Sequence, residues 1–255
     1  MARKIVITSG KGGVGKTTLA VNLGIALSKR GERVIVCDAD FGLNNADVIA
    51  GIENLVNYDI VDVIEGRCRG EQALVRHPQY RNLRLLASHS APERYISPQA
   101  LKLVLDGLSP KYDFILIDCP GGIDEGFHRA VACADEAIIV TTPHLPSLRD
   151  ADKVVTVLKS YEIEKISFIA NMVRGDLLVT GEILSLKELE SILKVPLLGI
   201  VPEACDLYLN RLGESEKTFK LLATNVLTGK RKLPDVTSRY KGLSGAIRRY
   251  FKSGL

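Results

Sequence analysis

The sequence predicts an α/β fold of three layers, in which a mostly parallel central sheet of about seven or eight strands is flanked by helices. Two observations carry this prediction. Short apolar runs alternate with stretches of helical character, and the glycine-rich and acidic segments directly follow such runs. Continuous apolar runs are typical of strands buried on both faces of a parallel sheet. Their alternation with helices indicates right-handed βαβ units, so the carboxyl ends of the strands share one edge.

The apolar runs place the expected strands at intervals along the whole chain: 4–8, 33–37, 83–87, 114–118, 136–141, 166–170 and 197–201. Helical stretches separate most of them: 16–29, 98–108, 125–133, 148–160, 185–193 and 215–226. Residues 52–82 are less clearly patterned, and we expect short helices there that cover the end of the sheet. One domain over residues 1–228 accounts for these elements, and residues 229–241 are expected to form a basic linker.

A glycine-rich motif follows the first expected strand. Residues 10–17 fit the pattern G-x-x-x-x-G-K-[ST], a phosphate-binding loop between a strand and a helix. Glycines let the chain curl until successive backbone N–H groups converge on an anion, which the dipole of the following helix also favours. The motif therefore predicts a P-loop NTPase fold. The residues expected to bind the nucleotide phosphates are Gly10, Lys11, Gly12, Gly13, Val14, Gly15, Lys16, Thr17 and Thr18.

The metal that accompanies nucleotide phosphates needs its own ligands. We expect Lys16 to reach the β- and γ-phosphates and the Thr17 hydroxyl to bind Mg²⁺. Asp118 ends the apolar run 114–118, and carboxyl ends of strands are where ligands bind in open α/β sheets. We interpret Asp118 as the Walker B carboxylate, which holds Mg²⁺ through a water molecule. A buried capping aspartate is the plainer alternative.

A second acidic segment, residues 38–47, follows the apolar run 34–37. Asp40 lies further out along this loop, and we expect it to orient the water that attacks the γ-phosphate. Asp38, at the strand end, is expected to lie near the metal. A plain turn with several acidic residues is the alternative interpretation of this segment.

Three segments together resemble the deviant Walker A ATPases of the MinD/ParA family, and the likeness is greatest to those of the MinD type. They are KGGVGKTT (11–18), DADFGLNNAD (38–47) and DCPGGIDEG (118–126), and the likeness extends over nearly the whole chain. The resemblance implies binding of ATP with Mg²⁺ and hydrolysis of ATP to ADP and phosphate. Such chemistry depends on positioning and on stabilisation of charge rather than on covalent steps. Lys16 and Asp40 would then be catalytic residues.

The resemblance also gives roles to residues whose spacing alone does not define one. Lys11, the extra lysine after the first glycine of the loop, is implied to be catalytic. In the family this lysine crosses the interface of a homodimer and binds the nucleotide of the partner. Asn171, Pro202 and Glu203 are implied to frame the adenine base. Turnover would therefore depend on the association of two ATP-bound subunits.

The last residues of the chain, 228–255, carry a strong positive charge. They hold eight basic residues against one acid, a net charge of +7 in a chain of +4, which leaves about −3 for the rest. Such asymmetry indicates an anionic partner surface. Residues 242–255 combine basic side chains with an apolar helical face, as in a helix that lies in a membrane interface, although a helix packed on the body is the alternative. The expected membrane-binding residues are Leu243, Ile247, Arg248, Arg249, Tyr250, Phe251 and Lys252.

These expectations combine into a functional hypothesis. ATP binding would drive homodimerisation and attach two tails to the anionic inner face of the cell membrane, and hydrolysis would release the protein into the cytoplasm. The resemblance implies regulation of division-site placement, with recruitment of a division inhibitor of the MinC type. An activator of the MinE type, or another topological factor, is also implied. We expect no structural nucleic acid.

Two related functions remain open at this point. A ParA-like partitioning ATPase would bind DNA through basic residues spread over the folded dimer, whereas the positive charge here gathers in the tail. An FlhG-like flagellar-number ATPase would carry an N-terminal extension, which we do not expect.

No run reaches 18 apolar residues, so the sequence predicts no membrane-spanning helix. The five cysteines lack C-x-x-C spacing and indicate reduced thiols rather than an iron–sulfur site.

Overall fold

The computed structural model describes residues 1–41, 45–88, 96–161, 163, 165–204, 207, 213, 215–242 and 245–246. Over these residues the chain forms one eight-stranded sheet in the order β3-β4-β2-β5-β1-β6-β7-β8. Neighbouring strands are parallel except for the antiparallel pair β3–β4. The predicted fold class is confirmed. The strands are β1 (Arg3–Thr8), β2 (Val34–Asp38), β3 (Leu74–Arg76), β4 (Leu83–Leu86), β5 (Phe114–Asp118), β6 (Glu136–Thr141), β7 (Lys165–Val173) and β8 (Leu197–Pro202).

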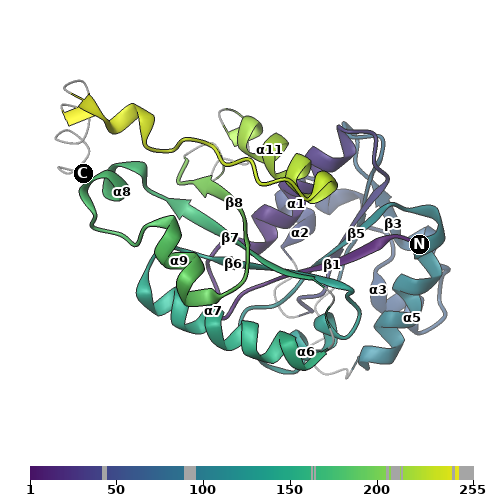
Figure 1. Cartoon of the computed structure of the whole chain (residues 1–255). Helices are drawn as coiled ribbons and strands as arrows, with labels where there is room; N and C mark the ends of the chain where they lie inside the picture. The colour runs from purple at the N-terminus through teal and green to yellow at the C-terminus, as the bar shows by residue number, and fades with distance from the viewer. Residues whose placement is uncertain are drawn as a thin grey trace.

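Helices cover both faces of the sheet and make the three predicted layers (Figure 1). One face carries α1 (Lys16–Ser28), α2 (Ala46–Ala50) and α11 (Ser215–Thr228). The other face carries α3 (Ile60–Ile64), α4 (Gly70–Ala73), α5 (Pro98–Leu108), α6 (Glu125–Val131), α7 (Leu145–Leu158) and α9 (Leu186–Leu193). The helix α8 (Gly175–Thr180) follows β7, and short 3₁₀ turns occupy Glu53–Leu55, Ser109–Lys111, Lys159–Tyr161 and Ser238–Tyr240.

The core consists of two apolar layers, one on each side of the sheet. Neighbouring residues of a central strand supply opposite layers, as Ile5 and Val6 of β1 do, because side chains alternate across a strand. Both layers are therefore apolar along the central strands, which explains the continuous apolar runs of the sequence. Close packing depends on two glycines: a Cβ at Gly24 of α1 would lie 2.7 Å from Val36 Cγ2, and one at Gly199 of β8 would lie 2.1 Å from Leu222 Cδ2.

The region of residues 52–82 contains the short helices that were predicted and also a strand that was not. β3 pairs antiparallel with β4 at the edge of the sheet, with Leu74 opposite Leu86 and Arg76 opposite Arg84. Three residues form this strand, and none of them is fully buried. An edge strand of this length leaves no apolar run in the sequence, so the prediction missed it.

The segment predicted as a linker, 229–241, is in contact with the domain at several points. The side chain of Asn225 accepts a hydrogen bond from Lys232 N and donates one to Lys232 O, at 3.0 and 2.9 Å. Arg231 forms an ion pair of 2.7 Å with Glu190 on α9. Val236 packs so closely on α8 that a Cβ at Gly175 would lie 1.8 Å from its carbonyl oxygen.

The predicted membrane-binding residues cannot be placed in this fold. Leu243, Ile247 and the run 248–252 lie outside the described residues, so the tail helix stays a prediction. No helix in the described part of the chain is both long and apolar enough to cross a membrane.

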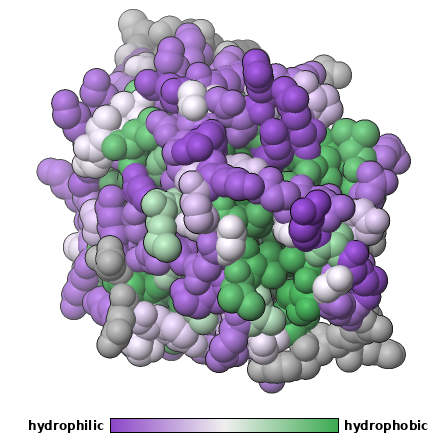
Figure 2. All heavy atoms as spheres, turned by 90° about the vertical axis from the view of Figure 1, so that its right-hand side faces the viewer, coloured by the Kyte–Doolittle hydropathy of each residue, from purple (hydrophilic) through white to green (hydrophobic). Residues whose placement is uncertain are grey.

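The side of the molecule that carries the N-terminus and α5 is mainly hydrophilic, with apolar areas between the polar side chains (Figure 2).

Candidate functional site

The three segments singled out in the sequence meet at one edge of the sheet. They follow β1, β2 and β5, which are neighbours in the order β2-β5-β1. Asp118 at the end of β5 lies in register with Asp38 of β2 on one side and Ile7 of β1 on the other. Parallel pairing therefore brings the glycine-rich loop and both acidic strand ends together, as the sequence predicted.

The glycine-rich loop forms a tight turn that ends at α1. Gly13 and Gly15 have φ angles of 77° and 90°, in the left-handed region that favours glycine. Gly15 is the N-cap of α1, and no described side chain caps it, so the N–H groups of the first turn remain available to an anion. The loop is also held from outside: a Cβ at Gly10 would lie 2.5 Å from the carbonyl oxygen of Asp150 on α7.

The two lysines of the loop have different surroundings. Lys16 is buried, and its Nζ donates a 3.1 Å hydrogen bond to Ser9 Oγ. The same hydroxyl donates a 2.6 Å hydrogen bond to the carbonyl oxygen of Lys11, whose side chain is exposed. The turn after β5 lies close to the ammonium, because a Cβ at Gly121 would be 3.2 Å from Lys16 Nζ and 3.0 Å from Gly12.

Asp118 is a buried carboxylate whose negative charge is only partly compensated by its neighbours. It is 1% exposed, and its Oδ1 atom has no hydrogen-bond partner among the described residues. Burial raises the pKa of Asp118 to about 8, and the charge of Asp38 adds to the rise, while a hydrogen bond from Thr17 and the charge of Lys16 oppose it. An orphaned carboxylate oxygen beside a threonine hydroxyl fits a divalent cation.

Magnesium suits this arrangement better than a metal that needs an all-protein cage. No cluster of three or more His, Cys, Asp or Glu side chains suited to a metal occurs in the described ranges. Mg²⁺ is usually held by one or two protein groups, and phosphate oxygens and water complete its octahedron. Thr17 and Asp118 are therefore the residues that could hold it together with a nucleotide.

Asp38 stabilises the loop that follows β2. Its Oδ1 accepts a 2.9 Å hydrogen bond from Asp40 N and its Oδ2 accepts one of 3.2 Å from Ala46 N. Burial raises the pKa of Asp38 to about 6 despite these two bonds. Asp40 is partly buried at the start of this loop, and its carbonyl oxygen accepts a hydrogen bond from Ser88 Oγ. Residues 42–44 of the loop lie outside the described residues.

The residues predicted to frame a base line one pocket beside the loop. Asn171, Pro202 and Glu203 lie there with Gly15 and Thr18. The amide Nδ2 of Asn171 donates a 2.7 Å hydrogen bond to the carbonyl oxygen of Val14, so the pocket is fixed to the phosphate loop. An irregularity in β7 shapes the side of the pocket that Asn171 lines. Its register against β8 shifts between residues 170 and 173, and Met172 has a φ of 54°.

Three neighbours of the site were not predicted from the sequence. Ser9 precedes the glycine–lysine pattern, Met172 lies in a strand that reads as continuous, and Gly121 approaches the loop across more than 100 residues of chain. The only available signal was indirect. Pro120, Gly121 and Gly122 indicate a turn after β5, but nothing in the sequence shows what that turn contacts.

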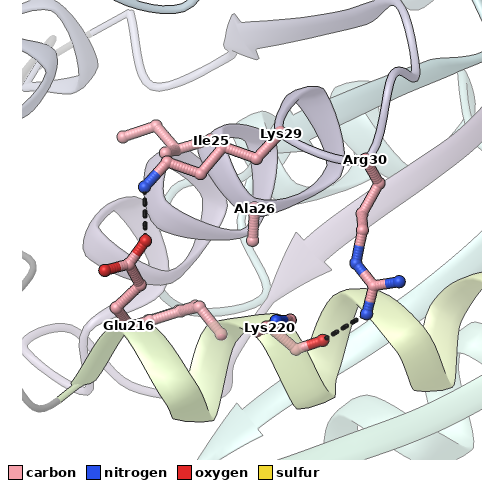
Figure 3. Close-up of a pocket in the computed structure, with 7 residues that line it drawn as sticks. Ile25, Ala26, Lys29, Arg30, Glu216 and Lys220 are labelled. Carbon is pink, nitrogen blue, oxygen red and sulfur yellow. Dashed lines mark hydrogen bonds and ion pairs between the residues drawn. The ribbon is translucent and has the colours of Figure 1, made fainter.

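A second hollow, of about 180 Å³, lies between α1 and α11 at the end of α1 remote from the loop (Figure 3). Three of its charged side chains, those of Lys29, Arg30 and Glu216, make polar contacts within the protein. Lys29 pairs with Glu216 at 2.6 Å, and Arg30 donates to the carbonyl oxygen of Lys220 at 3.5 Å. None of the predicted site residues lines it, so the nucleotide chemistry belongs to the carboxyl edge of the sheet.

Comparison with known proteins yields consistent matches. A family model described as an AAA domain matches residues 2–167. The septum site-determining protein MinD of Thermotoga maritima is 42% identical over 210 residues, which cover 81% of this chain and 78% of that protein. The septum site-determining protein MinD of Bacillus subtilis is 43% identical over 206 residues, which cover 80% of this chain and 77% of that protein.

Solved structures agree with the sequence relatives. The MinC:MinD cell division protein complex of Aquifex aeolicus contains a chain that superposes with a TM-score of 0.83 at 38% identity, over 91% of this chain and 98% of that one. The septum site-determining protein MinD of Pyrococcus horikoshii, complexed with Mg-ADP, superposes with a TM-score of 0.77 at 30% identity, over 89% of this chain and 97% of that one.

Proposed function

The chain belongs to the MinD family of septum site-determining ATPases, and from this premise we propose that it uses ATP to regulate where the division septum forms. One observation carries the proposal: the phosphate loop with Lys16 and the orphaned carboxylate of Asp118 meet at the same sheet edge. The ParA-like and FlhG-like alternatives are not favoured, because relatives that match most of the chain are septum site-determining proteins.

In this proposal the triphosphate lies in the loop of residues 10–18. Lys16 and the backbone N–H groups of the loop bind the phosphate oxygens and stabilise the charge on the transferring phosphoryl group. Thr17 and Asp118 hold Mg²⁺, which neutralises phosphate charge when it is bound. Asp38 keeps the loop after β2 in place, and Asp40 on that loop orients the attacking water.

The base pocket supports ATP as the nucleotide. Nδ2 of Asn171 donates one of its N–H groups to the carbonyl oxygen of Val14, so the amide oxygen of Asn171 is left as an acceptor for a ligand in this pocket. Adenine presents an amino group where guanine presents a carbonyl, so an acceptor favours adenine. Pro202 and Glu203 frame the base from the end of β8.

We propose that the ATP-bound form is a homodimer in which Lys11 reaches the nucleotide of the partner subunit. The exposure of Lys11, beside a loop whose other lysine is buried, supports this role. The tail of residues 242–255 then binds the anionic inner face of the membrane. One short amphipathic tail binds marginally, but two tails on one dimer bind much more tightly through effective concentration. Hydrolysis separates the dimer and releases the protein into the cytoplasm.

Partners follow from the same proposal. A division inhibitor of the MinC type is supported by the MinC:MinD complex of the Aquifex aeolicus relative. An activator of the MinE type, or another topological factor, would set the rate of hydrolysis and with it the time spent on the membrane. Recruitment of the inhibitor by the membrane-bound dimer restricts septum formation to sites where the dimer is absent.

Light scattering of the full chain tests the dimer switch. We expect a monomer without nucleotide and with ADP, and a dimer with ATP. The variant Asp40→Ala should extend the lifetime of the dimer, because the water is no longer oriented while the phosphate contacts remain. A monomer under every condition, with phosphate release at the rate of a buffer blank, would overturn the proposed function.

Sedimentation with vesicles that contain anionic phospholipid tests the membrane step. The full chain should sediment with vesicles in ATP and stay in solution in ADP. A chain that lacks residues 243–255 should stay in solution with either nucleotide. Equal sedimentation in all of these conditions would contradict a nucleotide-controlled tail.

A further inference from the structure

We propose that Ser9 is a positioning residue for both lysines of the phosphate loop. Its single hydroxyl links the ammonium of Lys16 to the carbonyl of Lys11 and holds both in the geometry that binds phosphate. Ser9 lies between the end of β1 and the first glycine of the motif, outside the glycine–lysine pattern. This inference rests on the proposed ATPase function and adds a residue to its machinery.

The direction of the two hydrogen bonds follows from the groups involved. A lysine ammonium can only donate, so Ser9 Oγ accepts from Lys16 Nζ at 3.1 Å. The hydroxyl hydrogen is then left for the carbonyl oxygen of Lys11, at 2.6 Å. Ser9 is only 1% exposed, so water does not compete for either bond. Its own carbonyl oxygen accepts from Gly122 N at 3.2 Å, which ties the turn after β5 to the same residue.

For Lys16, the bond orders a flexible side chain before the nucleotide arrives. An ammonium has three N–H groups, and Ser9 uses one, so two remain for phosphate oxygens. The position of Gly121, with a built Cβ 3.2 Å from Nζ, restricts the ammonium from the other side. Since this bond orders the lysine stem without help from the nucleotide, less conformational entropy is lost on binding.

For Lys11, the bond orients a peptide group. The carbonyl of Lys11 faces the buried hydroxyl, and in a trans peptide the N–H of the next residue points the opposite way. The hydroxyl therefore fixes the direction of Gly12 N–H, one of the donors of the loop. It also fixes the backbone from which the exposed Lys11 side chain leaves.

The test compares matched serine variants in the full chain. Ser9→Ala removes both bonds, and Ser9→Thr keeps the hydroxyl. Ser109→Ala is the control, because Ser109 is 2% exposed and its Oγ accepts a 2.8 Å bond from Ala2 N at the opposite end of the sheet. The measurements are the Kd for a fluorescent ADP analogue with Mg²⁺, steady-state kcat and KM for ATP, and the midpoint of thermal unfolding.

We expect Ser9→Ala to raise the Kd for the Mg²⁺–ADP analogue about tenfold and to lower kcat/KM for ATP by at least as much, since a hydrogen bond to a charged group is lost. Ser9→Thr should stay within about threefold of the wild type on both measures. Ser109→Ala should lower the thermal midpoint and leave Kd, kcat and KM unchanged. Wild-type values of Kd and kcat/KM in Ser9→Ala would overturn the inference.

A double-mutant cycle separates positioning from general loss of structure. If Ser9 acts through Lys16, Ser9→Ala should change the Kd less than threefold in a Lys16→Gln background. Fully additive effects of the two substitutions would overturn the inference. A wild-type chain that fails to bind the Mg²⁺–ADP analogue at all would instead remove the proposed function on which the inference rests.

Discussion

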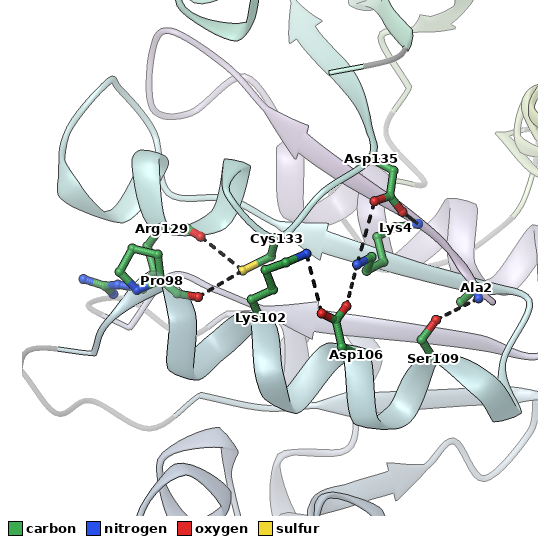
Figure 4. Close-up of polar contacts among 9 residues, drawn as sticks. All are labelled: Ala2, Lys4, Pro98, Lys102, Asp106, Ser109, Arg129, Cys133 and Asp135. Atoms are coloured by element: carbon green, nitrogen blue, oxygen red, sulfur yellow. Dashed lines mark hydrogen bonds and ion pairs between the residues drawn. The ribbon is translucent and has the colours of Figure 1, made fainter. Parts of the chain in front are cut away.

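Buried charged side chains are paired at one end of the central sheet and only partly compensated at the other. At the amino ends of the strands, the buried Lys4 ammonium lies between Asp106 and Asp135, at 2.6 and 3.7 Å (Figure 4). At the carboxyl ends, the buried carboxylates of Asp118 and Asp38 lie side by side, and one oxygen of Asp118 has no described partner. The buried charge at the amino end is paired on both sides, whereas the negative charge at the carboxyl end is only partly compensated by Lys16 and Thr17.

The pKa values of the carboxyl groups at the two ends differ in the same way. Burial works against the charged form of Asp106, but its hydrogen bond and charge interaction with Lys4 hold the pKa of this carboxyl below its usual value. The pKa of Glu136 is also lowered, because its contacts with Arg3 outweigh burial. Burial prevails at Asp118 and raises its pKa to about 8. Paired charges stabilise the fold at one end, and the less compensated charges at the other end support the proposed binding of Mg²⁺ and phosphate there.

The largest effect that separates the two ends should come from Lys16→Ala. Loss of the ammonium removes a charge that stabilises the transferring phosphoryl group, which is worth about 10²–10³-fold in turnover. Because Lys16 makes no ion pair in the described structure, the thermal midpoint of the nucleotide-free protein should change little. Phosphate release and thermal unfolding measure the two quantities. A large loss of stability with intact turnover would contradict the division of roles between the two ends.

Asp118→Asn should reduce turnover by up to about 100-fold, because a group that supports the metal is lost, and it should stabilise the metal-free protein. The carboxyl of Asp118 has a pKa of about 8 in the fold and about 4 in the unfolded chain, so the folded state binds the extra proton between these values. Stability due to this group is therefore present below pH 4 and is lost as pH rises towards 8. The Asp118→Asn variant has no carboxyl group at this position, so its stability does not fall for this reason as pH rises.

Denaturant unfolding in EDTA at several pH values checks the sign of that prediction. At pH 8 the Asp118→Asn variant should exceed the wild type by about 1 kcal/mol or more, and near pH 4 the two should coincide. Addition of Mg²⁺ and ADP should stabilise the wild type and not the variant. A variant that is less stable than the wild type at pH 8 would show that Asp118 is compensated after all.

The sequence predicts the architecture of both ends far better than their contacts. Runs such as Phe114–Asp118 are visible because both faces of the strand are buried, and this alone requires a continuous apolar pattern. The three-residue strand β3 has one exposed and two partly buried residues, so no periodicity reveals it. The phosphate loop is found because its chemistry needs particular residue types at fixed spacing.

Contacts between distant segments have no such signature. Asn171 reaches the carbonyl of Val14 across 157 positions, and its place beside the loop came from a family resemblance rather than from spacing. Ser9 was missed because a serine after a strand has no pattern of its own. Its role depends on the contacts of its hydroxyl with Lys16 Nζ and the carbonyl oxygen of Lys11, and only the three-dimensional structure shows these contacts.

At the amino end, Lys4→Met tests whether ion pairing there serves stability alone. The substitution keeps most of the buried stem but leaves Asp106 and Asp135 without their buried cation. We expect a loss of about 1–3 kcal/mol in the free energy of unfolding, because a hydrogen bond to a charged group is lost. The Kd for ADP and kcat should stay at wild-type values. A change in kcat at temperatures well below unfolding would show that the two ends are coupled.

The smallest effect should come from Lys102→Met, the matched control for Lys4→Met. Lys102 pairs with the same carboxylate, Asp106, but at 3.5 Å and with its side chain 47% exposed, against 9% for Lys4. An exposed i,i+4 pair contributes about 0.3–0.5 kcal/mol, and salt screens it. Denaturant unfolding at low and high salt should give a difference of that size at low salt and none at high salt. If Lys102→Met cost as much as Lys4→Met, then burial would not be what gives the amino-end network its strength.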